Sequence, residues 1–335
     1  MVMPNSLFGS RAGVVLASSY LPNNATFRVS DYCAMSVAAD RMRFSRPTID
    51  GQGFETANPG ARVRFNTNSS IVQINLQYTN LVTRMDTYDG QGAILSNGIV
   101  VASFNRAQGV AGPYQVRVDF GTTVDRLIEV VFPYCASVDF IGVDALAGTT
   151  LTVPVDRPST RFVATGDSIT HGFAAVGVTA SWPYKLGLSK GWQVVNHGYG
   201  GRSCIPADGT ALASLSPSIA TYLIGYNDFY AQLSLATFKA NYKSFINNFR
   251  TVNTTTKLYC ITPLWSSNSY GALTLEMYRT QIRDALTEIA NPLNVLVEGA
   301  PLATGNVSSF PDAIHPNDFG SSEIATSLAA VMPTP

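Results

Sequence analysis

The spacing of apolar residues changes near residue 155, and this change limits the folds that the chain can adopt. Before that point, apolar and polar side chains alternate along residues 72–78 and 114–120. A period of two places the apolar side chains on one face of a strand, as in a half-buried antiparallel sheet. Further short strands are expected at residues 63–65, 127–132 and 138–143. Together with the turn signal Asn97-Gly98, the pattern predicts an all-β, jelly-roll-like sandwich over residues 1–152.

Beyond Pro158 the chain combines short apolar runs with helical patterns. Buried strands are expected at residues 162–164, 192–195, 220–224, 258–262 and 295–297. Apolar residues at steps of three and four predict helices at 235–249 and 275–289, and a final helix is expected at 319–332. Strands that alternate with helices form a parallel sheet with helices on both faces. We therefore expect a flavodoxin-like, three-layer α/β domain over residues 161–335, preceded by a linker at residues 153–160.

The chain is poor in charged residues, and this excludes several classes of function. Only 13% of the residues are charged, against about 25% in typical proteins, and the formal net charge is zero. No basic field is available to attract nucleic acid or an anionic membrane surface. No apolar run reaches the roughly 18 residues that a membrane span needs. We therefore expect neither a nucleic-acid partner nor a membrane partner.

The residue types that are scarce also bear on location and cofactors. The first lysine is Lys185, and a predicted sandwich covered by uncharged polar residues favours an extracytoplasmic or particle-associated protein. The chain shows no basic segment followed by an apolar core and a cleavage site, the pattern of a secretory signal. Three histidines, and four cysteines in no zinc-binding spacing, lead us to expect no metal and no organic cofactor. Because Cys260 is predicted inside a central strand, we expect buried thiols.

Short polar motifs follow the predicted parallel strands. The first strand runs into Gly-Asp-Ser-Ile-Thr at residues 166–170, and the second into Asn-His-Gly-Tyr-Gly-Gly at 196–201. The third runs into Gly-Tyr-Asn-Asp at residues 225–228, and the loop before the last helix contains Asp-Ala-Ile-His-Pro at 312–316. In an open α/β sheet, ligands bind outside the carboxyl ends of the strands. The four motifs are therefore predicted to meet in one site.

Each motif supplies a group that acyl transfer requires. A serine at a sharp turn from strand to helix, here Ser168, is exposed as a nucleophile, and its backbone N–H lies at a helix start. A glycine N–H and the side-chain amide of Asn227 can stabilise a developing oxyanion. Asp312 precedes His315 by three residues and can orient the imidazole that deprotonates the serine. The sequence thus predicts a nucleophile, oxyanion donors, a base and an orienting acid.

These motifs, in this order over about residues 160–332, resemble those of the SGNH hydrolase superfamily, also called GDSL esterases. The resemblance implies a catalytic triad of Ser168, His315 and Asp312. It also implies an oxyanion hole made by the N–H groups of Ser168 and Gly201 and by the Asn227 amide. The acyl-enzyme would then be hydrolysed by water that His315 activates.

Three glycines of the second motif compete for the oxyanion position, namely Gly198, Gly200 and Gly201. In the family pattern an asparagine is followed by a small residue, and variable residues separate these from a glycine. Aligning that pattern on residues 196–201 selects Gly201.

Other polar and aromatic residues lie beside the predicted catalytic groups. Asp167 and Asp228 are expected to fix loops by accepting hydrogen bonds from backbone N–H groups. Four further side chains are candidates for substrate contact, with ordinary packing as the alternative: His171, Tyr199, Tyr226 and Trp265.

The first half of the chain is similar to the β-sandwich of two-domain carbohydrate esterases that remove acetyl groups from plant polysaccharides. The similarity rests on residues 60–65, Gly-Ala-Arg-Val-Arg-Phe, placed before the Gly-Asp-Ser motif. It implies a serine esterase whose substrate is a small ester or an acylated carbohydrate. The acyl group that it removes would be short, most simply acetyl. An acyltransferase of natural-product assembly shares this architecture, so transfer by the same triad is an alternative. The other alternative is a non-catalytic protein, either carbohydrate-binding or part of a particle, with a vestigial hydrolase domain.

Overall fold

The computed structural model describes residues 16–47, 57–81, 90–107 and 109–333. The chain divides into two compact units, one of residues 1–46 and 51–157 and the other of residues 47–50 and 158–335. Within the described residues, no helix is both long and apolar enough to span a membrane. The first unit is built from antiparallel sheets, whereas the second has a parallel sheet with helices.

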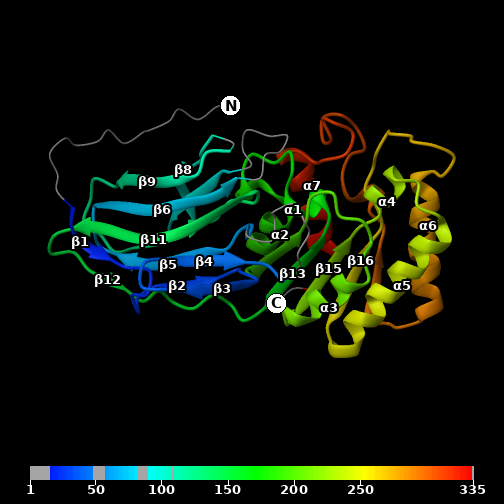
Figure 1. The fold of residues 1–335 in the computed structure, drawn as a ribbon, viewed down its shortest axis with the longest axis horizontal. Coiled ribbons are helices and arrows are strands. Elements are labelled where there is room, and N and C mark those ends of the chain that lie inside the picture. Colours follow the sequence, from blue (N-terminus) through cyan, green and yellow to red (C-terminus); the bar gives the residue numbers. More distant parts are fainter. Residues whose placement is uncertain (1–15, 48–56, 82–89, 108, 334–335) are drawn as a thin grey trace. The chain divides into compact units, whose positions relative to one another are not determined.

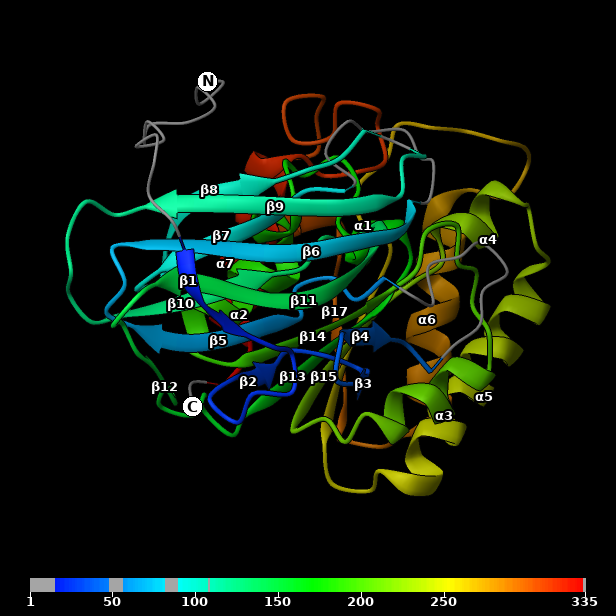
Figure 2. The same cartoon turned by 60° about the vertical axis from the view of Figure 1, so that its left-hand side comes forward.

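The first unit is a sandwich of two antiparallel sheets (Figures 1 and 2). One sheet has the order β3 (Ala34–Val37), β4 (Met42–Ser45), β11 (Ala136–Leu146), β6 (Ile71–Leu81) and β9 (Gly112–Asp119), with β1 (Leu16–Tyr20) paired to β11. The other has the order β12 (Leu151–Thr152), β5 (Arg62–Thr67), β10 (Arg126–Val131), β7 (Gly92–Ser96) and β8 (Ile99–Phe104), with β2 (Arg28–Ser30) paired to β5. Figure 2 shows β9, β6 and β11 side by side.

The alternation seen in the sequence produces the core of this sandwich. Along β6, Val72, Ile74 and Tyr78 are fully buried, whereas the intervening Gln73 and Asn75 are only partly buried. The buried side chains of both sheets form one continuous hydrophobic cluster. The prediction of an all-β sandwich is confirmed.

Buried charges hold the end of the first unit in place. Arg62 lies 3.1 Å from Glu129 and 3.5 Å from Asp31, and Arg64 lies 3.3 Å from Glu129. Arg157, the last residue of the unit, lies 3.4 Å from the same Asp31 carboxylate. Because a buried ion is costly without a partner, this network ties the segment after β12 back to the sandwich.

The second unit is built on a parallel sheet with the strand order β14 (Gln193–Gly198), β13 (Arg161–Gly166), β15 (Ile219–Leu223), β16 (Lys257–Ile261) and β17 (Asn294–Val297). Numbered along the chain this order is 2-1-3-4-5, which is the flavodoxin-like order. The helical elements are α1 (Ser168–His171), η2 (Val178–Ala180), α2 (Trp182–Lys190), α3 (Ala207–Ser214), α4 (Tyr226–Tyr230), α5 (Leu235–Val252), α6 (Leu275–Ile289), η3 (Ala300–Leu302) and α7 (Asp318–Val331).

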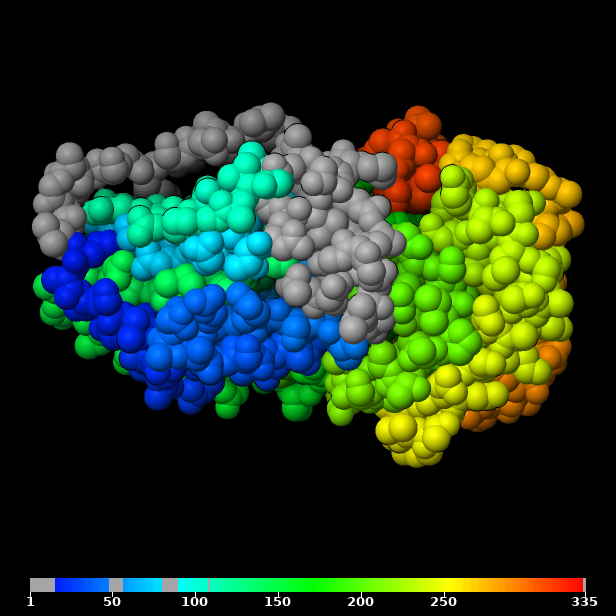
Figure 3. All heavy atoms as spheres, in the orientation of Figure 1, coloured from blue at the N-terminus to red at the C-terminus, as the bar shows by residue number. Residues whose placement is uncertain are grey.

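Helices cover both faces of the parallel sheet (Figure 1). On one face α2 packs against α7, and Trp182 and Leu328 join the core there. On the other face α3, α5 and α6 pack together, and the ring of Tyr222 from β15 stacks on Phe245 of α5 at 3.6 Å. In the space-filling view, α5 and the segment that leads into α6 form part of the surface of this unit (Figure 3). The predicted three-layer α/β domain is confirmed.

Candidate active site

The strand order brings the four sequence motifs to one edge of the parallel sheet. Ser168 comes two residues after β13 and Gly201 three residues after β14, while Asn227 lies in the helix that follows β15. Asp312 and His315 lie in the loop between η3 and α7, after the last strand β17. All five parallel strands end at this edge, so segments far apart in the sequence can meet there.

Three side chains form a continuous hydrogen-bonded chain. The Oγ atom of Ser168 lies 2.8 Å from Nε2 of His315, and Nδ1 of His315 lies 2.6 Å from Oδ2 of Asp312. Ser168 and His315 are buried, whereas the Asp312 side chain is 40% exposed. The serine and the histidine are thus withdrawn from bulk water, so the expectation of an exposed Ser168 is wrong. The carboxylate stands at the outer end of the hydrogen-bonded chain.

The ionisation of Asp312 sets the direction of these hydrogen bonds. Partial burial raises the pKa of Asp312, but hydrogen bonds from the imidazole and from the N–H groups of His315 and Ile314 outweigh it and lower the pKa to about 2. The ionised carboxylate only accepts hydrogen bonds, so Nδ1 of the histidine carries a proton. In the neutral imidazole Nε2 then has a free lone pair for the Ser168 hydroxyl proton.

Helix α1, which begins with Ser168, is a single turn held by its neighbours. Asp167 caps it by accepting the Ile169 N–H at 2.9 Å, which leaves Ser168 as its first residue. The buried Asn196 amide of β14 donates to the Thr170 carbonyl at 2.8 Å. A Cβ atom on Gly198 would lie 2.3 Å from the backbone nitrogen of His171, so a residue without a side chain is required there. Strand β14 therefore fixes the position of the turn that presents Ser168.

The candidate oxyanion donors differ in how they are bonded. The Gly198 N–H donates to the Asn196 side chain at 3.0 Å, whereas Gly201 is exposed with a φ of 73°, a conformation that favours glycine. The amide nitrogen of Asn227 donates to the Arg202 carbonyl at 2.9 Å. An amide nitrogen has two hydrogens, so this bond orients the Asn227 side chain and leaves a second N–H for another acceptor.

Two buried carboxylates lie behind these loops. Asp167 accepts the Ile169 N–H, and both oxygens of Asp228 lie within 3.2 Å of the Cys204 nitrogen. Burial raises the pKa of Asp167 to about 7 and that of Asp228 to about 6. The prediction that both aspartates fix loops through backbone N–H groups is confirmed.

The four candidates for substrate contact differ in their exposure. His171 and Tyr199 are fully buried, and the His171 ring packs on Phe173, whose ring meets that of His315 edge-on at 5.8 Å. Neither candidate has surface for a substrate. Trp265 is half-buried, with its ring 5.6 Å from that of Phe310. Of these three, Trp265 alone has accessible surface.

The fourth candidate, Tyr226, is buried at the start of α4. Its hydroxyl oxygen lies 2.6 Å from that of Tyr270 and 2.9 Å from the Asn268 amide nitrogen. Those two partners come from the segment between β16 and α6, in which the sequence shows no periodic pattern or motif. Sequence reasoning missed them for that reason. It also missed Asp208, which forms an ion pair with Arg202.

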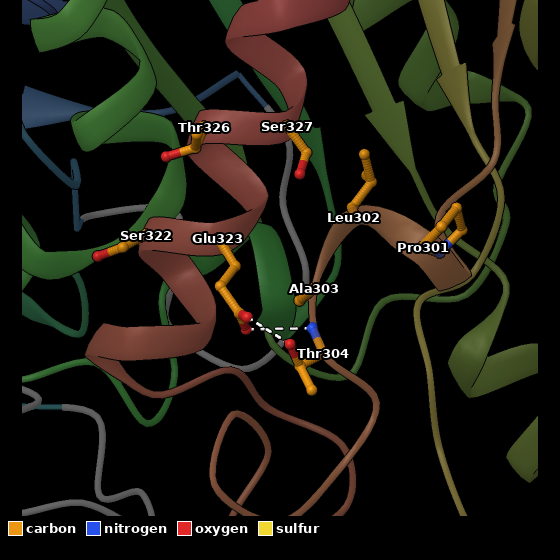
Figure 4. Close-up of a pocket in the computed structure, with 8 residues that line it drawn as sticks. All are labelled: Pro301, Leu302, Ala303, Thr304, Ser322, Glu323, Thr326 and Ser327. Atoms are coloured by element: carbon orange, nitrogen blue, oxygen red, sulfur yellow. Dashed lines mark hydrogen bonds between the residues drawn. The ribbon is translucent and has the colours of Figure 1, made fainter.

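The described residues contain no group of three His, Cys, Asp or Glu side chains placed to hold a metal ion. A hollow of about 480 Å³ lies between η3 and α7 (Figure 4). It is lined by Thr304 and Glu323 among others, and the Glu323 carboxylate accepts hydrogen bonds from the N–H and hydroxyl of Thr304. None of the residues of the Ser168–His315–Asp312 chain lines it.

Comparison with known proteins shows which family and which solved structures this chain resembles. Residues 164–322 match the model of the GDSL-like Lipase/Acylhydrolase family. No curated protein sequence matches the chain. Among solved structures, the salicylyl-acyltransferase SsfX3 from a tetracycline biosynthetic pathway is similar with a TM-score of 0.80 and 16% identity, covering 95% of this chain and 99% of that one.

Two carbohydrate esterases have the same fold. A family two carbohydrate esterase from Clostridium thermocellum, in complex with cellohexaose, has a TM-score of 0.72 at 12% identity, covering 91% of this chain and 98% of that one. The acetyl xylan esterase Est2A from Butyrivibrio proteoclasticus has a TM-score of 0.63 at 12% identity, covering 91% of this chain and 97% of that one. At these identities the likeness is one of fold.

The match of residues 164–322 to the GDSL-like Lipase/Acylhydrolase family confirms the resemblance seen in the sequence motifs. It places this domain in the class of carboxylic ester hydrolases.

Proposed function

We propose that the protein is a serine esterase in which Ser168 is the nucleophile, His315 the general base and Asp312 the orienting acid. The observation that supports this assignment is the hydrogen-bonded chain from Ser168 Oγ through His315 to Asp312, with distances of 2.8 Å and 2.6 Å. Nucleophile and base within hydrogen-bond reach, with the base oriented by a third group, is the arrangement that covalent acyl transfer requires.

The proposed reaction has two steps. Ser168 Oγ attacks the ester carbonyl carbon while its proton passes to Nε2 of His315, and the leaving alcohol then takes that proton as the C–O bond breaks. In the second step a water molecule loses a proton to His315 and attacks the acyl-enzyme. The carboxylic acid leaves, and the serine hydroxyl is restored with the proton that the histidine held.

The oxyanion of both tetrahedral intermediates is assigned to three donors. These are the N–H of Ser168, the N–H of Gly201 and the free N–H of the Asn227 amide. Ser168 is the first residue of α1, where backbone N–H groups have no partner inside the helix. The exposed Gly201 and the half-exposed Asn227 supply the other two.

The proposed substrate is a short acyl ester, most simply an acetyl group on a carbohydrate. The polar, weakly charged composition supports this choice, and so does the similarity of the chain to a family two carbohydrate esterase and to an acetyl xylan esterase. Transfer of the acyl group to an alcohol instead of water is the second candidate, and the similarity to the salicylyl-acyltransferase favours it.

Replacement of the nucleophile tests the assignment. Ser168→Ala should abolish hydrolysis of p-nitrophenyl acetate, while the matched variant Ser189→Ala on α2 should keep wild-type turnover. An S168A protein with wild-type turnover would refute the proposal. Glycan binding without turnover by the wild-type protein would instead support a non-catalytic carbohydrate-binding protein.

Two further measurements define the substrate. A series of p-nitrophenyl esters from acetyl to octanoyl should show the fastest turnover with the shortest chains, and faster turnover of octanoyl esters would contradict a deacetylase. Product analysis with a competing alcohol separates hydrolysis from transfer, since only a transferase forms the new ester in preference to the free acid.

A further inference from the structure

An ion pair lies directly beside two of the three proposed oxyanion donors, Gly201 and Asn227. Arg202, the residue after Gly201, binds Asp208 in a two-point contact, with Nε 2.9 Å from one carboxylate oxygen and Nη2 2.5 Å from the other. The side chains are only 11% and 5% exposed. A planar guanidinium that meets a carboxylate at two points in a buried setting fixes both orientation and distance.

The backbone of Arg202 links this ion pair to the oxyanion donors. Its carbonyl accepts the Asn227 amide at 2.9 Å, and its N–H donates to the Tyr199 carbonyl at 3.3 Å. The guanidinium lies 5.5 Å from the centre of the Tyr199 ring. The peptide of Gly201 and the side chain of Asn227 therefore depend on where Arg202 lies.

The loop is also fixed on its other side. The Cys204 N–H donates to the Asp228 carboxylate, and Asp228 is the residue after Asn227. Asp208 lies in the first turn of α3, where helix geometry favours a negative charge. Residues 201–204 are therefore held between α3 and α4, with the Arg202–Asp208 pair as the anchor on the α3 side.

We propose that Arg202 and Asp208 are positioning residues of the esterase, whose ion pair holds the Gly201 N–H and the Asn227 amide at the oxyanion. This inference rests on the proposed function. Neither side chain touches the reacting atoms, so the pair acts on the height of the chemical barrier and hardly on ground-state substrate binding. Lysine cannot replace arginine at a two-point contact without loss.

The test measures kcat and KM separately for p-nitrophenyl acetate. Asp208→Asn and Arg202→Lys should each lower kcat by about 10-fold to 100-fold, a smaller loss than the removal of a whole oxyanion donor causes. KM should change less than about twofold. Affinity for a boronic acid that mimics the tetrahedral intermediate should fall by a similar factor. Asp208→Glu, which keeps the carboxylate, should recover part of kcat. A rise in KM at unchanged kcat in D208N and R202K would overturn the inference.

A matched control and a double-mutant cycle separate positioning from general loss of structure. Asp139→Asn breaks a comparable two-point contact with Arg43 in the first unit and should leave kcat unchanged. In an Asn227→Ala background, D208N should cost less than it does in the wild type, because one of the two donors it positions is already absent. Equal costs in both backgrounds would contradict the proposal.

The outcomes also distinguish this inference from the proposed function. If S168A stays active, the proposed function fails. If S168A is inactive while D208N and R202K keep wild-type kcat, only the positioning role fails. If D208N does not fold, R202K, which keeps a cation opposite Asp208, decides the same question.

Discussion

A single carboxylate, that of Asp312, holds both the backbone and the ring of His315. Its Oδ1 accepts the His315 N–H at 2.7 Å, while its Oδ2 binds Nδ1 of the imidazole at 2.6 Å. The same Oδ1 also accepts the Ile314 N–H at 2.9 Å. The orientation of the imidazole is therefore set within four consecutive residues, and only its distance from Ser168 depends on the rest of the fold.

Asp312→Asn should lower kcat for p-nitrophenyl acetate by about 10²-fold to 10⁴-fold with little change in KM. The amide can donate a hydrogen bond to Nδ1, which stabilises the tautomer with its proton on the wrong nitrogen. Steady-state kinetics measure the effect, and Asp284→Asn on the exposed face of α6 is the control. A D312N enzyme within threefold of the wild type would contradict the proposed triad.

Asn227→Ala should lower kcat by about 10²-fold, because a proposed oxyanion donor is removed while the proposed nucleophile and base stay in place. Stability should change little, since Asn227 is half-exposed and the one hydrogen bond described for its side chain is to the Arg202 carbonyl. The control Asn253→Ala removes an amide at the end of α5. Unchanged turnover in N227A would remove Asn227 from the oxyanion hole.

Asp228 should make the protein less stable as the pH rises. Burial raises the pKa of Asp228 from 3.8 to about 6, so between these values the folded state binds more protons than the unfolded state. Its stabilising contribution is therefore present below about pH 4 and is lost as the pH rises through about 6. The shift corresponds to about 3 kcal/mol.

Urea unfolding of the wild type and Asp228→Asn at pH 4, 5, 6 and 7 measures this contribution. The asparagine oxygen can still accept the Cys204 N–H but does not titrate. The difference in unfolding free energy should therefore move in favour of D228N as the pH rises. Parallel pH curves for the two proteins would rule out this role for Asp228.

Gly198→Ala should destabilise the second unit by about 1–3 kcal/mol, the usual cost of overpacking, and should reduce activity by moving α1. The added Cβ would lie 2.3 Å from the His171 nitrogen and 2.7 Å from the Thr170 carbonyl carbon, both backbone atoms. Thermal unfolding and kcat measure the two effects. Gly271→Ala is the control, because the three atoms nearest to its Cβ would belong to the Gln232 side chain and not to backbone.

The elements that the sequence predicts well are those with a regular apolar spacing. Helix α5 was expected at 235–249 and spans Leu235–Val252, and it buries Phe238, Tyr242 and Phe245 on one face. Helices α2 and α3 were not predicted, because their apolar residues form no single stripe. In α2, Trp182, Pro183 and Tyr184 are buried in succession.

The motif residues at the strand ends are also predictable, because the sheet determines where they lie. A parallel sheet must bring the carboxyl ends of its strands together, so the proximity of Ser168 and His315 can be expected from the sequence alone. The Arg202–Asp208 pair could not, because it depends on the path of an irregular loop into an unpredicted helix. The Tyr226–Tyr270 contact likewise depends on the conformation of a segment without periodicity.

The hydrogen bond between Ser168 and His315 joins residues 147 positions apart. The proposed nucleophile lies early in its domain, whereas the proposed base is reached only after the last strand of the sheet has been made. On the proposed mechanism, a nascent chain can present a fully folded sandwich and the serine turn and still be inert. Catalysis would switch on only once the segment after β17 has closed over the sheet edge, so turnover reports completion of the domain during synthesis.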